Sequence, residues 1–275
     1  MEQTRVIDYS QFHSRLRIPG RLHLDTPLRI GAGGLPGATE VDLPVIKDAA
    51  QRPFIPGSSF KGAFRAHLES ILRVFNNEFA CGTLTDGVRC ISQERINRWK
   101  SEYRDNAAGL SDKLLQETCW TCRVFGAPWL ASKVLFKDMP VAPETWFGRY
   151  QERSGVGIDR DTETAGDKLL YATEAVPAGT EFEFEMMVEN AGDLEQGLIL
   201  LGIQEVARGQ MTLGGARSRG LGWVHLNVKW DEAYRIDRTS LRHFLITGKG
   251  QPLADENARK KLVEDFLREV GGVHA

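Results

Sequence analysis

The sequence predicts an α+β fold, built as one elaborated domain of 275 residues. Two segments, 16–24 and 182–188, alternate apolar and polar residues with the period of a half-buried strand. Between them, apolar residues recur at every third or fourth position from Phe60 to Phe75, which is the spacing of an amphipathic helix. A chain of this length, with 41% hydrophobic residues, can bury a sizeable core.

The order of the elements narrows the architecture. The segment SKVLFKDM, residues 132–139, predicts a short strand after the first helix. A helix with buried face between Leu194 and Val206 follows strand 182–188 and leads to an alternating strand at 224–230. The resulting order, strand, helix, strands, helix, strand, matches the split βαβ pattern of a ferredoxin-like fold.

Two segments interrupt this order, and one helix follows it. Residues 76–130 contain all four cysteines and a charged helical stretch, so we expect an insertion there. Residues 147–168 are polar and contain glycine with little apolar periodicity, which predicts a long exposed loop or hairpin. Residues 254–272 predict a final amphipathic helix.

Composition limits the classes of function. The 35 Lys and Arg residues nearly balance the 37 Asp and Glu residues, so nucleic-acid binding would have to depend on local clusters. The first 20 residues lack the apolar core of a signal peptide, and we find no long uninterrupted apolar stretch. We therefore expect a cytoplasmic protein without a membrane partner. The six histidines form no HxH or HxxxH pair, which disfavours a histidine-metal nuclease.

The stretch RPFIPGSSFKGAFRAHLES resembles a phosphate-binding loop at first sight, but Lys61 precedes Gly62, so the spacing of an ATP-binding Walker loop is absent. What remains is the N-terminus of a helix, which Ser58 or Ser59 is expected to cap. Lys61 and Arg65 lie one turn apart on its surface, an arrangement that suits a phosphodiester. The alternative is a capped surface helix with two solvated cations.

A second glycine-rich stretch, LGGARSRGLGW, has the same character. Glycine allows close approach of a ligand to the backbone, and arginines placed among glycines can contact phosphates without reading sequence. A tight turn before a strand is the alternative. The candidate residues are Gly214, Gly215, Arg217, Ser218 and Arg219.

The cysteines are spaced as C-x8-C followed, after a long gap, by C-x2-C. The CxxC pair has the spacing of a zinc knuckle, and a separated pair can supply the other two ligands. A redox pair is disfavoured because the CxxC does not follow a strand of a parallel βαβ unit. With no cysteine left over, the sequence favours one closed structural Zn²⁺ site over plain buried thiols. Its ligands would be Cys81, Cys90, Cys119 and Cys122.

Five blocks across residues 16–230 carry a resemblance to a known family. Together they resemble the RNA-cleaving, Cas-seven-type backbone subunit of type III CRISPR effector complexes, a member of the RAMP superfamily. The blocks are GRLHLDTPLRIGAGG, VDLPVIKDAAQRPFIPGSSFKGAFRAHL, CWTCRVFGAPWLASKVLFKDM, GIDRDTETAGDKLLYATEAVPAGTEFEFEM and LGGARSRGLGWV.

The resemblance implies an RRM-like core, a guide RNA (crRNA) bound along its backbone, and subunits stacked in a filament with neighbouring copies or paralogues and other effector subunits. A thumb hairpin would splay the duplex of guide and complementary target RNA, with Thr162 and Thr164 beside the splayed bases. The implied division of the single domain 1–275 is a core (about 14–75, 131–146 and 169–232), a zinc-binding insertion (about 76–130), a thumb (about 147–168) and a C-terminal helix (about 233–275).

The resemblance implies that an aspartate before the PVIKD segment cleaves the target RNA. The matching residue here is Asp42, whereas Asp48 matches a structural position. A loop carboxylate beside a phosphodiester can hold a divalent cation, Mg²⁺ or Mn²⁺, or take a proton from the attacking 2′-OH. Either role predicts a 2′,3′-cyclic phosphate product. Asp42 as a turn or capping residue is the alternative.

Three functional hypotheses follow. The first is a guide-binding subunit that cleaves complementary RNA with Asp42. The second is a non-catalytic subunit for crRNA binding and filament assembly. The third is an endonuclease that processes precursor crRNA, which requires a placed histidine or another acid–base pair that the matched loops lack. The resemblance also implies that the guide phosphates face Gly57, Ser58, Ser59, Lys61 and Arg65 and the second glycine-rich stretch.

Overall fold

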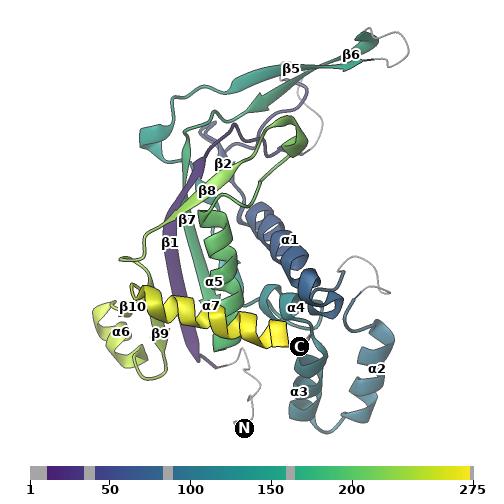
Figure 1. Ribbon diagram of the computed structural model, residues 1–275, viewed down its shortest axis with the longest axis vertical. Helices are drawn as coiled ribbons and strands as arrows, with labels where there is room; N and C mark the ends of the chain where they lie inside the picture. Colours follow the sequence, from purple (N-terminus) through teal and green to yellow (C-terminus); the bar gives the residue numbers. More distant parts are fainter. Residues whose placement is uncertain (1–10, 34–40, 83–88, 159–164, 273–275) are drawn as a thin grey trace.

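The computed structural model describes residues 11–33, 41–82, 89–158 and 165–272, with the backbone alone at 157–158 and 165–170. It has a mixed α and β architecture around an antiparallel sheet (Figure 1), which confirms the predicted α+β class. The glycine-rich stretches, the cysteines and Asp42 all fall within the described ranges, whereas Thr162 and Thr164 lie outside them.

Strand β1 is the centre of a six-stranded sheet. Strand β7 pairs antiparallel with β1 along one edge from Arg15 to His23, and β3 pairs with the outer edge of β7. On the other edge of β1, β8 pairs with Gly20 to Leu24 and β9 pairs with Ser14 to Arg17. The six strands are β1 (Ser14–Leu24), β3 (Val134–Phe136), β7 (Glu181–Glu189), β8 (Val224–Val228), β9 (Tyr234–Asp237) and β10 (Gln251–Pro252).

Helices α1 (Gly57–Phe75), α5 (Asp193–Ala207) and α7 (Glu256–Gly271) contribute to the same hydrophobic core as the apolar side chains of β1 and β7. Phe60 of α1 lies at its centre, with its ring centroid 5.1 Å from that of Phe136 and 5.4 Å from that of Phe184. The helical spacing of apolar residues therefore places one stripe of α1 on the apolar side of the sheet.

The other face of the sheet is charged, as the alternation in β1 and β7 requires. Arg15 pairs with Glu189 and Arg17 pairs with Glu185, each at 2.6 Å between nitrogen and oxygen. Arg21 contacts Glu183 at 2.8 Å. The arginines of β1 are thus matched by glutamates on the neighbouring strand.

The insertion carries helices α2 (Gln93–Glu102), α3 (Ala107–Glu117) and α4 (Trp120–Phe125). A small separate apolar cluster of Ile91, Ile96 and Trp99 holds its outer part together. Ser92 and Asn106 cap α2 and α3 by accepting hydrogen bonds from backbone N–H groups of the first turns.

Strands β5 (Gln151–Ile158) and β6 (Ala165–Ala175) form a two-stranded hairpin that projects away from the central sheet (Figure 1). It extends beyond the 147–168 segment in which the sequence predicted a loop or hairpin. Two further short strands, β2 (Phe54–Ile55) and β4 (Met139–Pro140), pair with each other.

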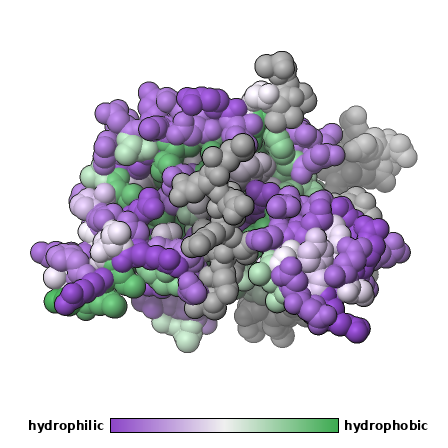
Figure 2. Space-filling model, turned by 90° about the horizontal axis from the view of Figure 1, so that it is seen from below, coloured by the Kyte–Doolittle hydropathy of each residue, from purple (hydrophilic) through white to green (hydrophobic). Residues whose placement is uncertain are grey.

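The segment from residue 233 onward was expected to be helical, and this was only partly right. Strand β9, helix α6 (Leu241–Thr247) and strand β10 precede α7. β9 and β10 are four and two residues long and gain their stability from pairing at the sheet edge, so local periodicity gives little signal for them. Leu245 and Ile246 of α6 are 74% and 75% exposed, and Figure 2 shows apolar residues at the edge of the molecule where α6 lies.

The contact between α5 and α7 generates a stability prediction. A Cβ atom at Gly197 of α5 would lie 2.3 Å from the carbonyl oxygen of Leu262 in α7. Gly197→Ala should therefore lower the free energy of unfolding by about 1–3 kcal/mol, measured by urea denaturation. Gly62→Ala in α1 is the matched control, because a Cβ there has no atom within 4 Å, and it should raise stability by up to about 1 kcal/mol. Equal effects of the two substitutions would contradict the close packing.

Candidate functional site

The loop that follows β1 is the centre of a junction of four segments. Leu28 exchanges two backbone hydrogen bonds with Val176, at 2.9 and 2.8 Å, next to the end of β6. The Ile30 carbonyl accepts from the Ile46 amide, and the Pro27 carbonyl accepts from the Gly222 amide. The candidate aspartate loop, the base of the hairpin and the second glycine-rich loop are therefore all anchored to residues 27–30.

Asp42 lies against the base of the hairpin. Its Oδ2 accepts a hydrogen bond from the Ala172 amide at 2.7 Å, and the adjacent Leu43 amide donates to the Ala172 carbonyl at 3.1 Å. The side chain is exposed, and within the described part of the chain its Oδ1 has no hydrogen-bond partner. One carboxylate oxygen is thus fixed by the backbone and the other is open to a ligand.

Glu174 holds the rest of this loop. Its buried carboxylate accepts from the Val45 amide at 2.9 Å and from Lys47 Nζ at 2.8 Å. Lys47 also lies 4.3 Å from the centroid of the Tyr150 ring, whose hydroxyl donates to the Gln51 carbonyl. The Lys47 ammonium is therefore occupied within the fold.

Asp48 closes its own turn. It accepts from the amides of Ala50 and Arg52 and from Arg52 Nε, each at 2.9 Å. The hydrogen bond from the Arg52 amide is the main reason why the pKa of Asp48 is lowered. Of the two aspartates of this region, Asp42 alone has an oxygen open to a ligand.

The second glycine-rich loop rests on residues 28 and 29. The Gly215 amide donates to the Arg29 carbonyl at 2.9 Å, and a Cβ at Gly214 would lie 2.1 Å from the same oxygen. Gly214 also has a φ of +73°, so only glycine fits there without strain. Arg217, Ser218 and Arg219 follow in an exposed 3₁₀ turn.

Tyr171 joins this loop to the hairpin. Its hydroxyl is hydrogen-bonded to Arg219 Nη1, and its ring lies over Gly155 on the opposite strand, where a Cβ would come within 2.3 Å of it. The next residue is Ala172, which binds Asp42. Asp42 and Arg219, which are far apart in sequence, are therefore held by consecutive residues of β6.

The first helix starts differently from the expectation that Ser58 or Ser59 caps it. The N-cap is Pro56, and the Gly57 amide donates to Asp138 Oδ1 at 2.8 Å. The serines lie instead in the exposed first turn. Asp138 follows β3 and reaches the helix only in the folded chain, so the sequence around residue 57 could not reveal it.

Lys61 and Arg65 face the insertion. Lys61 Nζ donates to Ser132 Oγ at 2.7 Å, and burial, followed by the nearby charge of Arg65, lowers the pKa of Lys61. Arg65 donates to Glu69 at 2.8 Å, to the Gly126 carbonyl at 3.2 Å and to Cys122 Sγ at 3.4 Å. Burial opposes the charge of Arg65, but Glu69 and Cys122 raise its pKa overall.

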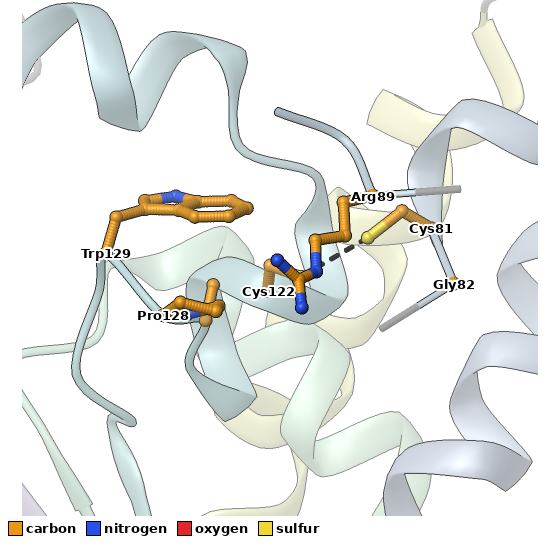
Figure 3. Close-up of a pocket in the computed structure, with 7 residues that line it drawn as sticks. Cys81, Gly82, Arg89, Cys122, Pro128 and Trp129 are labelled. Atoms are coloured by element: carbon orange, nitrogen blue, oxygen red, sulfur yellow. Dashed lines mark hydrogen bonds between the residues drawn. The ribbon is translucent and has the colours of Figure 1, made fainter. Parts of the chain in front are cut away.

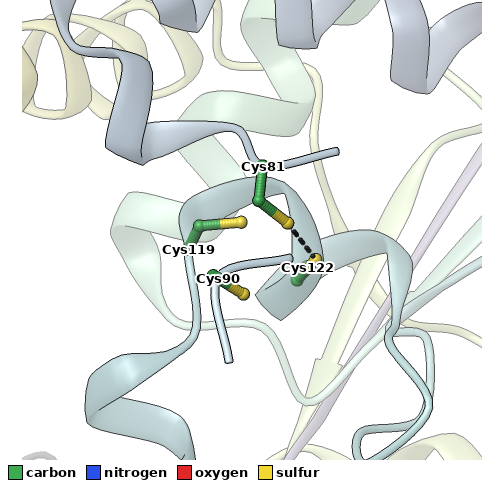
Figure 4. A group of neighbouring side chains, drawn as sticks. All are labelled: Cys81, Cys90, Cys119 and Cys122. Atoms are coloured by element: carbon green, nitrogen blue, oxygen red, sulfur yellow. Dashed lines mark hydrogen bonds between the residues drawn. The ribbon is translucent and has the colours of Figure 1, made fainter. Parts of the chain in front are cut away.

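The four cysteines meet in one cluster beside α4 (Figure 4). All four sulfurs lie within 4.8 Å of one another, with 3.5 Å between Cys81 and Cys122. Sulfurs around a tetrahedral zinc ion are roughly 3.8 Å apart, because Zn–S bonds are about 2.3 Å long. Hydrogen bonding by its thiol neighbours, Cys122 first, lowers the pKa of Cys119. The donor set therefore fits a thiophilic metal ion such as zinc.

A pocket adjoins this cluster (Figure 3). Trp129, Pro128 and Arg89 line it together with Cys81 and Cys122. Arg89 points toward Cys81, and Arg65 contacts Cys122 Sγ, so two guanidinium groups lie beside the sulfurs. Guanidinium groups near thiolates favour their ionised, metal-binding form.

Comparison with known proteins decides the family. The model of the RAMP superfamily matches residues 21–225. The chain belongs to the RAMP superfamily. The match includes all four segments of the junction, the first helix and the cysteine cluster, whereas the whole of β9 to α7 lies beyond it.

A curated relative adds a more specific likeness. The CRISPR system Cms endoribonuclease Csm3 of Enterococcus italicus is 45% identical to this RAMP protein over 60 residues. The matched stretch covers 20% of this chain and 27% of the relative. The chain thus spans about a quarter of that relative's length. In the described ranges of this RAMP protein, no helix is long and apolar enough to cross a membrane.

Two residues of the junction escaped the sequence analysis. Tyr171 gains its position by pairing across the hairpin with Gly155, and no local pattern reveals such a pair. Arg29 lies between Leu28 and Ile30 in an apolar stretch, and its environment comes from Gly31 and from Gly215, which is nearly 190 residues away. The signal that could have identified Arg29 is its position as a single cation in an apolar, glycine-rich turn.

The contacts of Glu174 generate a second stability prediction. Glu174→Gln cannot accept from both the Val45 amide and Lys47, since one of its terminal atoms becomes an N–H donor. We expect a loss of about 1–3 kcal/mol in the free energy of unfolding, with faster hydrogen exchange at the Val45 amide. Glu152→Gln, at an exposed position of β5, is the control and should change neither quantity. Unchanged exchange at Val45 in Glu174→Gln would refute the anchoring role.

Proposed function

We propose that this RAMP protein is a backbone subunit of a type III CRISPR effector complex, which binds crRNA and cleaves complementary target RNA with Asp42. Membership of the superfamily and the name of the Enterococcus relative, an endoribonuclease of a CRISPR system, support the proposal. The observation that carries it is the geometry of Asp42 at the junction of four segments. Its Oδ2 is fixed by the Ala172 amide, and its Oδ1 is open to a ligand.

The architecture supports the finer parts of the proposal. Strand order β8-β1-β7-β3, with α1 and α5 as the two connecting helices, is the arrangement of a ferredoxin-like or RRM-like core. We assign the thumb to the β5–β6 hairpin, and we propose the division of the chain into core, insertion, thumb and C-terminal part, which these elements support. Other effector subunits and neighbouring copies in a filament are the proposed protein partners, in the cytoplasm.

Guide RNA would lie along the loop end of the core. The exposed turn of Arg217, Ser218 and Arg219, approached through Gly214 and Gly215, offers cations and backbone amides to phosphates.

The start of α1 is the second region that would contact the guide. Ser58, Ser59 and Lys61 follow Gly57 there and offer two hydroxyls and one ammonium group. Burial lowers the pKa of Lys61, and a phosphate beside it would favour the charged form and so oppose that shift. We assign Arg65 to holding α1 against the cysteine cluster, because its donors already have partners there.

Asp42 would act on the target RNA that is paired with the guide. A carboxylate beside a phosphodiester can take the proton of the ribose 2′-OH as that oxygen attacks phosphorus, which expels the 5′ oxygen and leaves a 2′,3′-cyclic phosphate. The hydrogen bond from Ala172 fixes the rotation of the carboxylate, so that Oδ1 remains available. In the alternative role, Asp42 would instead hold a divalent cation, Mg²⁺ or Mn²⁺, at this oxygen, and that ion would neutralise charge on the phosphate.

The cleavage proposal is tested by Asp42→Asn, which keeps an acceptor for the Ala172 amide but removes the charge. In the assembled complex with matching target RNA, we expect cleavage to fall by about 10²-fold or more, with unchanged target binding. Asp112→Asn, at an exposed position of α3, should cleave normally. Full cleavage by Asp42→Asn would remove Asp42 from the mechanism and leave it only the role of fixing the loop.

We also propose that Cys81, Cys90, Cys119 and Cys122 hold a structural Zn²⁺. Four thiolates leave no position for water, so this ion would stabilise the insertion without taking part in cleavage.

The zinc proposal predicts about one zinc per chain in the wild type and almost none in Cys119→Ser. The variant should also show a lower unfolding temperature, because the cluster connects the insertion to α1 through Cys122 and Arg65. Metal analysis and thermal denaturation measure the two effects. Ser111→Ala, at an exposed position of α3, is the control with wild-type zinc. A full zinc content in Cys119→Ser would remove this residue from the ligand set.

A further inference from the structure

Arg29 is a cation at the junction of the four segments, and none of the described residues pairs with its guanidinium. Its Nε is buried and unpaired, and within the described ranges its guanidinium makes no hydrogen bond or ion pair. The neighbouring cations differ, since Lys47 is bound by Glu174 and Arg219 by Tyr171. A buried polar group without a partner destabilises a fold, so its presence at a junction of loops indicates a ligand.

Two glycines, Gly31 and Gly215, lie beside the guanidinium of Arg29. A Cβ at Gly215 would lie 3.1 Å from Nη1, and a Cβ at Gly31 would lie 3.5 Å from Nη2. Because glycine has no side chain, these two sides of the guanidinium stay uncovered, whereas any larger residue would cover them. The Arg29 backbone is fixed as well, because its carbonyl accepts from the Gly215 amide at 2.9 Å. The side chain is half-buried, and Gly31 and Gly214 beside it are exposed.

A half-buried guanidinium held in this way selects a particular chemistry. Its N–H donors form a planar fork that matches two oxygens of a phosphate. Arg217 lies in the exposed turn that begins two residues after Gly215, and it would extend the positive charge along a chain of phosphates. A polymer of phosphodiesters fits this layout better than an isolated anion.

We propose that Arg29 binds a backbone phosphate of the guide RNA, from beneath the second glycine-rich loop, and so fixes the RNA beside Asp42. This inference rests on the proposed function and adds to it a residue that neither the sequence motifs nor the comparisons assign. Arg29 binds and positions the RNA, and it takes no part in the bond-making steps.

The test is the salt dependence of binding of the full chain to a single-stranded guide RNA. Arg29→Gln removes one phosphate contact, so the slope of log K against log[salt] should become shallower by about 0.7. Affinity at low salt should fall by about tenfold. Arg29→Lys retains the charge but not the fork, and it should keep the slope with a smaller loss of affinity. Arg242→Gln, at an exposed position of α6, is the matched control and should bind as the wild type does.

Thermal unfolding separates ligand binding from a structural role. Because Arg29 has no partner within the described protein, Arg29→Gln should unfold at or above the wild-type temperature. Weaker binding together with a lower unfolding temperature would show that Arg29 supports the loops, and would overturn the proposal. An unchanged slope and affinity in Arg29→Gln would overturn it as well, while guide binding itself would stand. Failure of the wild-type chain to bind the RNA would overturn the proposed function along with it.

Discussion

The pairing of β1 with β7 is the constraint on which the rest of the structure depends. It runs without a break from Arg15 to His23 and sets the register of both strands. A slip by one residue would turn Leu16, Ile18 and Leu22 out of the core and Arg15, Arg17 and Arg21 into it. The arginine–glutamate pairs on one face and the phenylalanine contacts on the other therefore specify the same alignment.

This register positions the functional loops, because β1 continues directly into the segment 25–32. Leu28, Ile30 and the Arg29 carbonyl then bind the end of β6, the Asp42 loop and the second glycine-rich loop. Each of these loops is held by backbone hydrogen bonds to a segment that the central strand delivers. These hydrogen bonds position the site, although few of its residues belong to helices or strands of the sheet.

Local patterns explain what the sequence could predict. The alternation of apolar and polar residues in 182–188 and the helical spacing of apolar residues from Phe60 onward identified β7 and α1. The spacing of the cysteines predicted that the four thiols lie together, as they do. The cap at Asp138, the short strand β9 and the position of Tyr171 depend on partners far away in the chain. Residue type and resemblance singled out Asp42 and the second glycine-rich loop as candidates, but their contacts with consecutive residues of β6 required the folded backbone.

The charged face of the sheet has a consequence for where a polyanion can approach. Its arginines are neutralised in place by glutamates, and such pairs contribute only about 0–1 kcal/mol each to stability. Their larger effect is to cancel the field over most of that face, in a chain whose net charge is −2. Among the described residues, Arg29 and the exposed Arg217 at the loop end have no acidic partner. A nucleic-acid strand that arrives by diffusion would therefore find unpaired cations at this end, and paired ones on the face of the sheet.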